Sequence, residues 1–578
     1  MNQKNKCHRC SKEYRVDEWD LNFLKKISPK LDNEVHSIDS PKLCFDCRMT
    51  TLMAWRNERN LHPLACSCCG KDIISVFSKE NNYKVLCSEC FWSDKVDPHL
   101  SSTTYDKKKS FFDQFDVLLH NAKLLTLYAA NNENCEYVNQ ESDDNNCYLC
   151  IGGYGNQDCY HCTYSLASRK CIDCLGITDS ENLYECTMCF SCYNCQHLYN
   201  CTNCRDCYFC EDCVGCENCF GSINLRYKKY YFFNEQLDKK EYKRKVAEYL
   251  GSREGIVAAK SKFAEHRLDF VFKYSFRFFC DESCDGDILI QCKDVQNTYY
   301  SAGAQNTKNS YIINQIKDVL DGLAVGRGEL VYYSGSSISL FGSAFCSSCY
   351  TLRNSYYCFM CYNSNDLFGC VGLNHKQYCI FNKQYTKQEY EKEVARIISE
   401  MRKKSEWGEF FPIGMSPFGY NESMAMEYYP KDRQEIKKIK ANWREEDIQK
   451  INSNIYKPKD ISQYHIDNNE DAESEIDKCI NGILKCEESG RPFRIISREL
   501  AQYIERNIQL PRLHPNLRHR DRLGKLCKIK LYHRKCMNEG PSFAGTTDGR
   551  CTNEFETTYA PERPEKVYCE SCYQKEII

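Results

Sequence analysis

Asn146-Cys147-Tyr148-Leu149-Cys150 is followed twelve residues later by Asp158-Cys159-Tyr160-His161-Cys162, and after another twelve by Lys170-Cys171-Ile172-Asp173-Cys174. The same spacing returns at Cys346, Cys358 and Cys370. A short fixed period indicates stacked structural coils rather than one ordinary globular core. The helical period of 3.6 residues does not fit it. We therefore expect a mixed, mainly β fold with two cysteine-rich β-solenoids of twelve-residue coils, each flattened into two six-residue sides.

The cysteines of these coils have three possible roles. A narrow coil leaves room only for small side chains, and cysteine is small, apolar and readily buried. We expect a ladder of reduced, metal-free thiols, with metal along the ladder or disulfide rungs as alternatives. The second array keeps the period at Asn297 and Asn309, and again at Gly342, Asn354 and Asp366, although small and aliphatic residues replace many of its cysteines. That replacement favours a packing role.

Both arrays end in a similar closing segment. Phe220-Gly221, with the Tyr-rich run up to Gln236, recurs 148 residues later as Phe368-Gly369 and the run up to Gln384. A charged segment that predicts a helix follows each copy, near 239–250 and near 386–403. Solenoids need caps that stop edge pairing. The chain therefore contains a duplicated unit of coil stack, closing strand and capping helix.

Paired cysteines outside the arrays indicate metal. The first residues lack the apolar core of a secretory signal, and no stretch approaches the ~18 apolar residues that span a membrane. We therefore expect a cytoplasmic protein with reduced thiols and no membrane contact, in which CxxC pairs hold metal. Two CxxC turns complete a closed four-thiolate site typical of structural zinc. We expect about three Zn2+ ions, bound by Cys7, Cys10, Cys44 and Cys47, by Cys66, Cys69, Cys87 and Cys90, and by Cys536, Cys551, Cys569 and Cys572. Cys68 is an alternative ligand in the second set.

A further segment resembles the first zinc ribbon, which is the segment that carries Cys7, Cys10, Cys44 and Cys47, but it lacks the full set of ligands. Cys486 matches Cys7, and Ser489 matches Cys10. With a middle nine residues shorter, His514 and Leu517 match Cys44 and Cys47, and Arg518 matches Arg48. Serine and leucine cannot replace a thiolate. We expect this copy to be a metal-free ribbon held together by packing.

Two basic elements, Arg48–Arg59 and Arg512–Lys535, could contact nucleic acid. The chain carries 78 Lys and Arg against 80 Asp and Glu, a net charge of -2, so only local clusters could favour an acidic partner. Arginine beside an aromatic ring can hold phosphate and stack a base. The open alternatives are packing helices with solvated arginines, or a basic surface that docks on the acidic 467–475 run. The candidate residues are Arg48, Trp55, Arg56, Arg59, Arg518, Arg520, Arg522, Lys525, Lys528 and Lys530.

The sequence motifs do not indicate a particular enzymatic reaction. The sequence has no Walker loop, no GxSxG elbow and no HExxH, and we expect a non-enzymatic protein. The first hypothesis is a zinc protein that binds RNA, DNA or the ribosome through basic ribbons, with the solenoids as a rigid platform. The second is a scaffold that binds protein partners through its Tyr-rich solenoid face. Metal storage and a hydrolase activity are weaker alternatives. The oligomeric state is open.

Three further stretches carry a family resemblance. They are Phe368–Tyr385, Trp407–Pro412 with Ser416–Glu422, and Thr557–Pro564. Together they resemble an uncharacterised family of long, cysteine-rich, multi-zinc-ribbon proteins of candidate-phyla bacteria. The resemblance implies an intracellular zinc protein and brings no catalytic residue.

The patterns divide the chain into ten segments. They are zinc ribbons at 1–62 and 63–110, a connecting helix at 111–134, a solenoid at 135–236, capping helices at 237–270, a second solenoid at 271–384, a capping helix at 385–404, an irregular and helical linker at 405–478, a degenerate ribbon at 479–530 and a C-terminal ribbon at 531–578.

Overall fold

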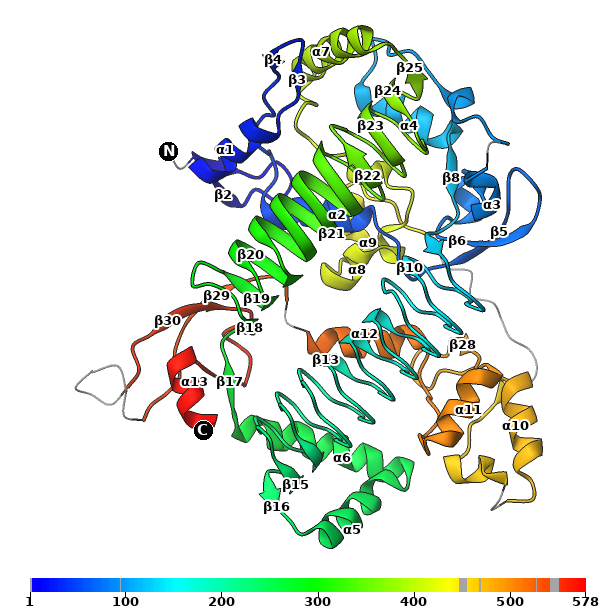
Figure 1. Ribbon diagram of the computed structural model, residues 1–578, viewed down its shortest axis with the longest axis vertical. Helices are drawn as coiled ribbons and strands as arrows, with labels where there is room; N and C mark the ends of the chain where they lie inside the picture. Colours follow the sequence, from blue (N-terminus) through cyan, green and yellow to red (C-terminus); the bar gives the residue numbers. More distant parts are fainter. Residues whose placement is uncertain are drawn as a thin grey trace.

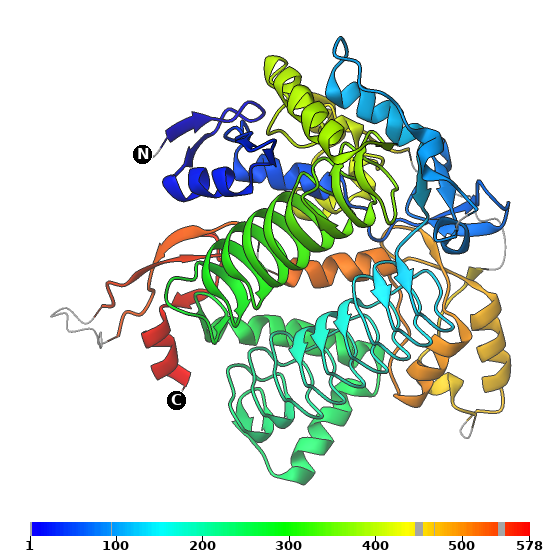
Figure 2. The same ribbon diagram turned by 45° about the horizontal axis from the view of Figure 1, so that its top comes forward.

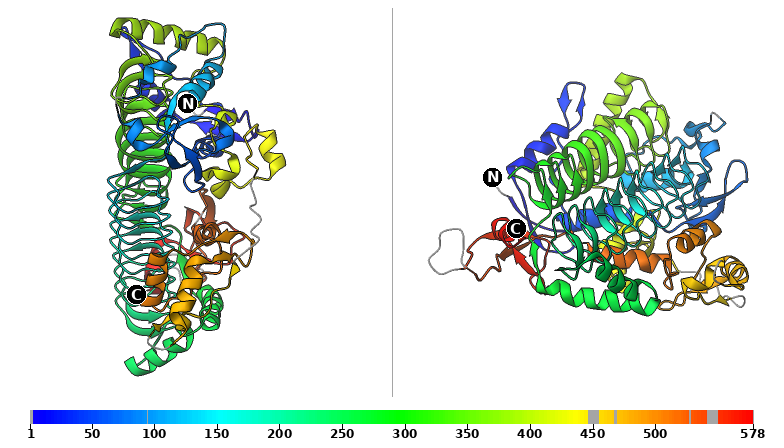
Figure 3. Two further views of the ribbon diagram at one scale, coloured as in Figure 1. Left: turned by 90° about the vertical axis from the view of Figure 1, so that its right-hand side faces the viewer. Right: turned by 60° about the horizontal axis from the view of Figure 1, so that its bottom comes forward.

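The computed structural model describes residues 3–93, 95–445, 455–466, 469–526, 528–540 and 550–577. Two stacks of short parallel strands lie side by side (Figure 2). Small hairpins and helices pack at their ends and against one side of the layer that they form (Figure 3). The molecule thus has a layer of coils and a layer of ribbons, and the N- and C-terminal segments both belong to the ribbons (Figure 1).

The first coil stack, residues 129–232, pairs each coil in parallel with the next at an offset of twelve. Tyr148 pairs with Tyr160, and Tyr160 with Ile172. Most of this pairing is a series of isolated bridges, so few named strands appear. They are β9 (Ala129–Ala130), β10 (Glu141–Ser142), β11 (Thr163–Leu166), β12 (Leu175–Thr178), β13 (Thr187–Phe190), β14 (Glu217–Phe220) and β15 (Lys229–Phe232).

The coils turn at every third residue. Asn146, Leu149 and Asp158 have φ of 55°, 53° and 53°, and Gly152 and Gly155 occupy the two positions between Leu149 and Asp158 with φ of 75° and 65°. A twelve-residue coil therefore has four such turns, and the expectation of two six-residue sides is wrong. Left-handed backbone costs about 1–2 kcal/mol per ordinary residue and least for Gly, Asn and Asp.

The residue after each turn points inward. Cys147, Cys150, Cys159 and Cys162 are completely buried. Each thiol has backbone carbonyls as hydrogen-bond acceptors: Cys150 Sγ lies 3.3 Å from Cys159 O. The sulfur columns fill the coil interior together with Leu183, Leu198 and Ile177 in one apolar cluster. A buried polar group that forms a hydrogen bond avoids the free-energy cost of an unpaired one. These thiols are therefore suited to a protein core.

The second coil stack, residues 277–380, has the same register with more aliphatic filling. Tyr299 pairs with Tyr311, and Leu340 with Leu352. Val295, Val319 and Leu340 occupy its interior beside Cys346 and Cys358. Its strands are β18 (Arg277–Phe278), β19 (Gly286–Ile290), β20 (Lys293–Ala302), β21 (Gln305–Ala344), β22 (Tyr350–Arg353), β23 (Tyr362–Phe368) and β24 (Gln377–Ile380).

An antiparallel strand and a helix close each stack. β16 (Glu235–Gln236) turns back on β15, and β25 (Lys383–Gln384) turns back on β24. α5 (Lys239–Leu250) and α6 (Arg253–His266) follow the first, and α7 (Lys387–Lys403) follows the second. The two closing segments that resemble each other in sequence thus occupy equivalent places.

Four ribbon-like modules flank the stacks. The first has β1 (Gln3–Lys6), β2 (Glu13–Val16), α1 (Glu18–Ile27), β3 (Lys30–Leu31), β4 (Glu34–Val35) and α2 (Phe45–Ala54). The second has β5 (His62–Ala65), β6 (Asp72–Ser75), β7 (Lys84–Leu86) and α3 (Ser88–Phe91), followed by α4 (Phe111–Asn121) and β8 (Lys123–Leu125). The third has β27 (Ile483–Lys485), β28 (Pro492–Phe493), α11 (Ser497–Glu505) and α12 (Pro515–Lys525). The fourth has β29 (Tyr532–Lys535), β30 (Glu554–Thr557), β31 (Lys566–Tyr568) and α13 (Glu570–Ile577).

The ribbons link the two stacks in an exchanged pattern: the second and third ribbons meet the first stack or the strand before it, and the first and fourth meet the second stack or the strand before it. β7 of the second ribbon pairs in parallel with β8, just before the first stack, and β31 of the fourth pairs with β17 (Val271–Lys273), just before the second. β8 and β17 are 148 residues apart, the offset that relates the stacks. The first and third ribbons dock through side chains instead. Arg48 of the first ribbon is bonded to Asp321 of the second stack, and Arg518 of the third ribbon is bonded to Asp173 of the first stack. Asp173 and Asp321 are again 148 residues apart, so the docking is duplicated with the fold.

The segment after α7 fills the space between the first ribbon and the second stack. Trp407, Phe410 and Phe411 are buried in the largest apolar cluster, with Trp55 and Phe115. The remaining elements are α8 (Met424–Tyr428), α9 (Arg433–Lys438), β26 (Ile455–Tyr456) and α10 (Ala472–Asn481).

Candidate metal centres

Twelve cysteines come together in three groups of four that could hold a metal ion. Within each group all sulfur atoms lie within 4.8 Å of one another. The groups are the three sets expected from the sequence, two with two CxxC pairs each and one whose first pair, Cys536 and Cys551, is split by fourteen residues: Cys7, Cys10, Cys44 and Cys47; Cys66, Cys69, Cys87 and Cys90; and Cys536, Cys551, Cys569 and Cys572. Cys68 is exposed and stands outside the second group.

The sulfur separations fit a tetrahedral metal. Four thiolates about 2.3 Å from a central Zn2+ lie about 3.8 Å from one another. One sulfur pair from each group is separated by 3.6 Å (Cys10 and Cys44), 3.9 Å (Cys69 and Cys87) and 3.8 Å (Cys551 and Cys569). These distances are far longer than a disulfide bond of about 2.05 Å. The donor sets therefore match a closed four-thiolate centre.

The first group is built by a knuckle and a helix start. The Cys7 N–H donates to Lys12 O at 2.9 Å, which closes the turn that carries Cys7 and Cys10. Cys44 is the residue before α2, so its sulfur lies at the positive end of a helix, which favours a thiolate. Hydrogen bonding to the Cys47 thiol is the largest influence on the Cys44 thiol, and it lowers the Cys44 pKa to about 5.

The second and fourth ribbons have the same construction. The Cys66 N–H donates to Lys71 O at 2.8 Å, and the Cys536 N–H to Asn553 O at 2.9 Å. Burial disfavours the Cys66 thiolate, but backbone N–H groups of Cys69, Cys87 and Cys68 bond its sulfur and lower its pKa to about 6. Burial also opposes the Cys569 thiolate, yet hydrogen bonds led by Ser571 and Asn553 lower its pKa to about 6. N–H groups that point at sulfur are suited to metal-bound thiolates.

The third ribbon keeps this backbone without the ligands. The Cys486 N–H donates to Arg491 O at 2.9 Å, as Cys7 does to Lys12. The Glu487 N–H donates to Arg512 O at 3.1 Å, which matches the bond from His8 to Lys42 at 3.1 Å and places His514 where Cys44 stands. Packing replaces the missing thiolates, because Phe493, Leu500 and Tyr503 form a core with Cys486. Burial lowers the pKa of His514 to about 4, so it is a neutral residue of this core at pH 7.

Thiols inside the coils do not share one direction of pKa shift: hydrogen bonds to neighbouring thiols, led by Cys207, lower the pKa of Cys219 to about 5. Burial raises the pKa of Cys150, Cys159 and Cys171 well above the ordinary value for cysteine. These sulfurs face backbone carbonyls, which accept hydrogen bonds from the protonated form. A thiol with a raised pKa is a poor metal ligand at neutral pH, since the ligand is the thiolate.

The candidate nucleic-acid residues of the first ribbon are inside the protein. Arg48 is 5% exposed, and both of its bonds to the Asp321 carboxylate measure under 3 Å. Trp55 is completely buried against Phe411, and Arg56 is bonded to Glu58 at 2.5 Å. Arg59, which is half-buried, donates to Thr163 Oγ1 at 2.8 Å. Docking on the coils covers these residues, so the alternative of a packing helix fits this segment and the nucleic-acid hypothesis does not.

The basic segment at 512–535 is divided between core and surface. Arg518 and Arg522 are 5% and 2% exposed and both bond Asp173. Arg520 is exposed and paired with Glu488 at 3.0 Å. Lys525, Lys528 and Lys530 are also exposed. The buried arginines dock on the coils.

Sequence reasoning missed the two aspartates that receive these arginines. Asp173 and Asp321 stand at turn positions of the coils, where aspartate is expected for backbone reasons alone. The signal was the coincidence of two repeats: Arg48 matches Arg518 in the ribbons, and Asp321 matches Asp173 in the coils.

Comparison with known proteins finds no family model that matches the chain and no curated protein similar to it. Within the described residues, no helix has the length and apolar character that crossing a membrane requires.

Proposed function

We propose that the protein is a zinc-dependent, non-enzymatic scaffold. Its ribbons fix two β-solenoids of twelve-residue coils in one arrangement, and the coil surfaces bind a partner. Zinc at the three four-cysteine groups then has a structural role, since every ligand position is filled by the protein and none is left open for a substrate. The predicted cytoplasmic location and the proposed family membership agree with reduced, metal-bound thiols.

The exchanged docking of the ribbons is the observation that carries this proposal. One ribbon pairs in parallel with the strand just before each stack, and another ribbon docks on the stack through a buried arginine–aspartate pair. If a ribbon unfolds, its contact with a stack is lost, even where that stack is far from the ribbon in sequence. Metal at the ribbons therefore controls how the stacks are held.

Amide hydrogen exchange before and after zinc chelation tests the proposal. The third ribbon provides an internal control because packing rather than thiolates holds it. We expect α2, β31 and β17 to lose protection on chelation, while α12 keeps its protection. Equal loss in α2 and α12, or no change in either, would contradict a scaffold braced by zinc.

Nucleic-acid binding, the first hypothesis from the sequence, becomes the second candidate, now through exposed cations of the 512–535 segment. Arg520, Lys525, Lys528 and Lys530 are exposed, and Lys530 lies over the Tyr532 ring at 4.5 Å. Four phosphate contacts would weaken binding by a slope of about -3.6 in a plot of log affinity against log salt. Retention of RNA, DNA or ribosomes at low salt and their release at high salt would favour this candidate. Retention of a protein at both salt levels would favour the scaffold.

A further inference from the structure

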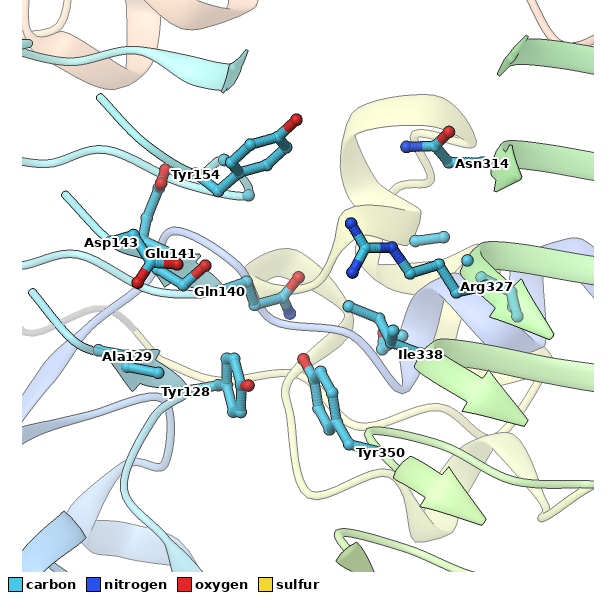
Figure 4. A pocket seen from close by; sticks show the side chains of 18 of the residues that line it. Tyr128, Ala129, Gln140, Glu141, Asp143, Tyr154, Asn314, Arg327, Ile338 and Tyr350 are labelled. Carbon is cyan, nitrogen blue, oxygen red and sulfur yellow. The ribbon is translucent and has the colours of Figure 1, made fainter. Parts of the chain in front are cut away.

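A groove of about 920 Å³, lined by both polar and apolar side chains, lies between the two coil stacks. One wall comes from the first stack, with Gln140, Asp143 and Tyr154, and the other from the second stack, with Asn314, Arg327 and Tyr350 (Figure 4). The Tyr128 and Tyr350 rings stack across one end, with centroids 4.2 Å apart and planes 7° apart. Ligand sites of this size are common at the junction of two structural units.

Several groups in the groove have unused hydrogen-bonding capacity. Arg327 extends from the second stack toward Gln140 (Figure 4), and no hydrogen bond or ion pair joins it to another residue in the described ranges. One oxygen of Asp143 accepts a bond from Asn131 at 3.1 Å, which leaves its other oxygen available. The Tyr154 ring is 48% exposed. The groove thus offers a free guanidinium, a carboxylate and an aromatic face.

Glu141 borders the groove from inside the first stack. It is 1% exposed, and burial together with a hydrogen bond to the Asp144 carboxyl raises its pKa well above the ordinary value. Its carboxyl is therefore held inside the coils and is not one of the groups that a ligand contacts.

Charge and backbone pairing exclude two kinds of ligand. Among the described residues that line the groove, a polyanion would meet Arg327 as the one unpaired cation, since Arg56 is bonded to Glu58, and Asp143 would repel it. A peptide could not add as a strand, because Tyr154 already pairs with Ser142 on one side and with Leu166 on the other. The groove groups fit an uncharged ligand rich in hydroxyl groups, since planar amide, carboxylate and guanidinium groups each bond neighbouring hydroxyls and a tyrosine ring covers a flat apolar face.

We infer that this groove binds a neutral oligosaccharide, with Tyr154 stacked on a sugar ring and Arg327, Asp143 and Asn314 bonded to hydroxyl groups. The inference rests on the proposed scaffold role, because the groove exists only while the ribbons hold the stacks together. The ligand contacts both stacks, so its affinity depends on the relative position of the stacks as well as on the residues that line the groove.

Titration calorimetry on the zinc-loaded full chain tests the groove. The probes are maltohexaose, cellohexaose, laminarihexaose and chitohexaose, and we expect at least one to bind with a Kd below about 1 mM. Tyr154→Ala and Arg327→Ala should each weaken that binding about tenfold or more, the equivalent of about 1.4 kcal/mol. The matched controls are Tyr227→Ala, which removes a tyrosine that is 80% exposed outside the groove, and Arg353→Ala, which removes a cation that lies over Phe341. Both should bind like the unchanged protein.

Three results would overturn the inference. One is no binding of any of the four probes up to about 10 mM. Another is binding that Tyr154→Ala and Arg327→Ala leave unchanged. The third is binding of polyuridylate that Tyr154→Ala abolishes, which would assign the groove to nucleic acid. Failure of the groove in any of these ways leaves the exchange experiment on chelation unaffected, because that experiment uses no ligand.

Discussion

Arg48 shows how one residue connects two distant parts of the chain. Its guanidinium is buried in a two-bonded contact with Asp321, 273 positions away. Removing one partner leaves the other charge buried and unpaired, which costs about 3–5 kcal/mol. Arg48→Ala should therefore lower the opening free energy of α2, measured by amide hydrogen exchange, by that amount.

The matched control for Arg48 is Arg520. Arg520 has a carboxylate partner, Glu488 at 3.0 Å, but its side chain is 62% exposed. Exposed pairs contribute about 0–1 kcal/mol. If Arg48→Ala and Arg520→Ala lower stability equally, the docking pair is not the contact that holds the first ribbon.

Asp144 gives the protein a pH dependence inside its first coils. Burial raises the pKa of this carboxyl from 3.8 to about 6, although the Asn156 N–H donates to it at 2.7 Å. Because the folded pKa lies above the unfolded one, the contribution of this group is fully present below pH 3.8 and is lost as the pH rises through 6. Asp144→Asn removes the charge, and we expect it to stabilise the coils by about 1–3 kcal/mol at pH 8 and not at pH 4.

Thermal unfolding of Asp144→Asn at the two pH values checks this sign. Asp143→Asn is the control, since Asp143 is exposed next to it. A gain for Asp144→Asn that is larger at pH 4 than at pH 8 would show that burial does not destabilise the Asp144 carboxylate.

At the scale of the element, sequence predicted the coil length and missed its shape. The twelve-residue period of cysteines is visible because the same interior column recurs once per coil. The four turns per coil are less visible, since turn positions hold Leu149, His161 and Phe209 as well as Asn, Asp and Gly. Neighbouring coils fix these unfavourable turns through backbone bonds, which composition does not report.

The turn column gives a direct test of that coil geometry. Asn194 has φ of 52°, and its side chain donates to Asp206 of the next coil at 2.6 Å. A β-branched residue is strained in this conformation, whereas glycine adopts it freely. Asn194→Val should therefore lose about 1–2 kcal/mol more stability than Asn194→Gly, measured by denaturant unfolding. The opposite order would mean that the turn is not left-handed.

At the scale of the molecule, sequence indicated the modules and not their contacts. The spacing of Cys7, Cys10, Cys44 and Cys47 is local, so the metal group follows from it. The partner of Arg48 is not local, and the basic segments therefore looked available for nucleic acid. The docking pairs join one repeat in the ribbons to another in the coils, and only the folded structure shows which residues of the two repeats meet.

The division of the cysteines is the central claim, and metal content measures it most directly. Elemental analysis of reduced, purified protein should find about three zinc ions per chain, one for each four-cysteine group. Cys44→Ala should lower that number by about one, and Cys159→Ala should leave it unchanged, since one removes a metal ligand and the other a core thiol. A content of roughly ten or more ions, or a fall with Cys159→Ala, would contradict a metal-free thiol core.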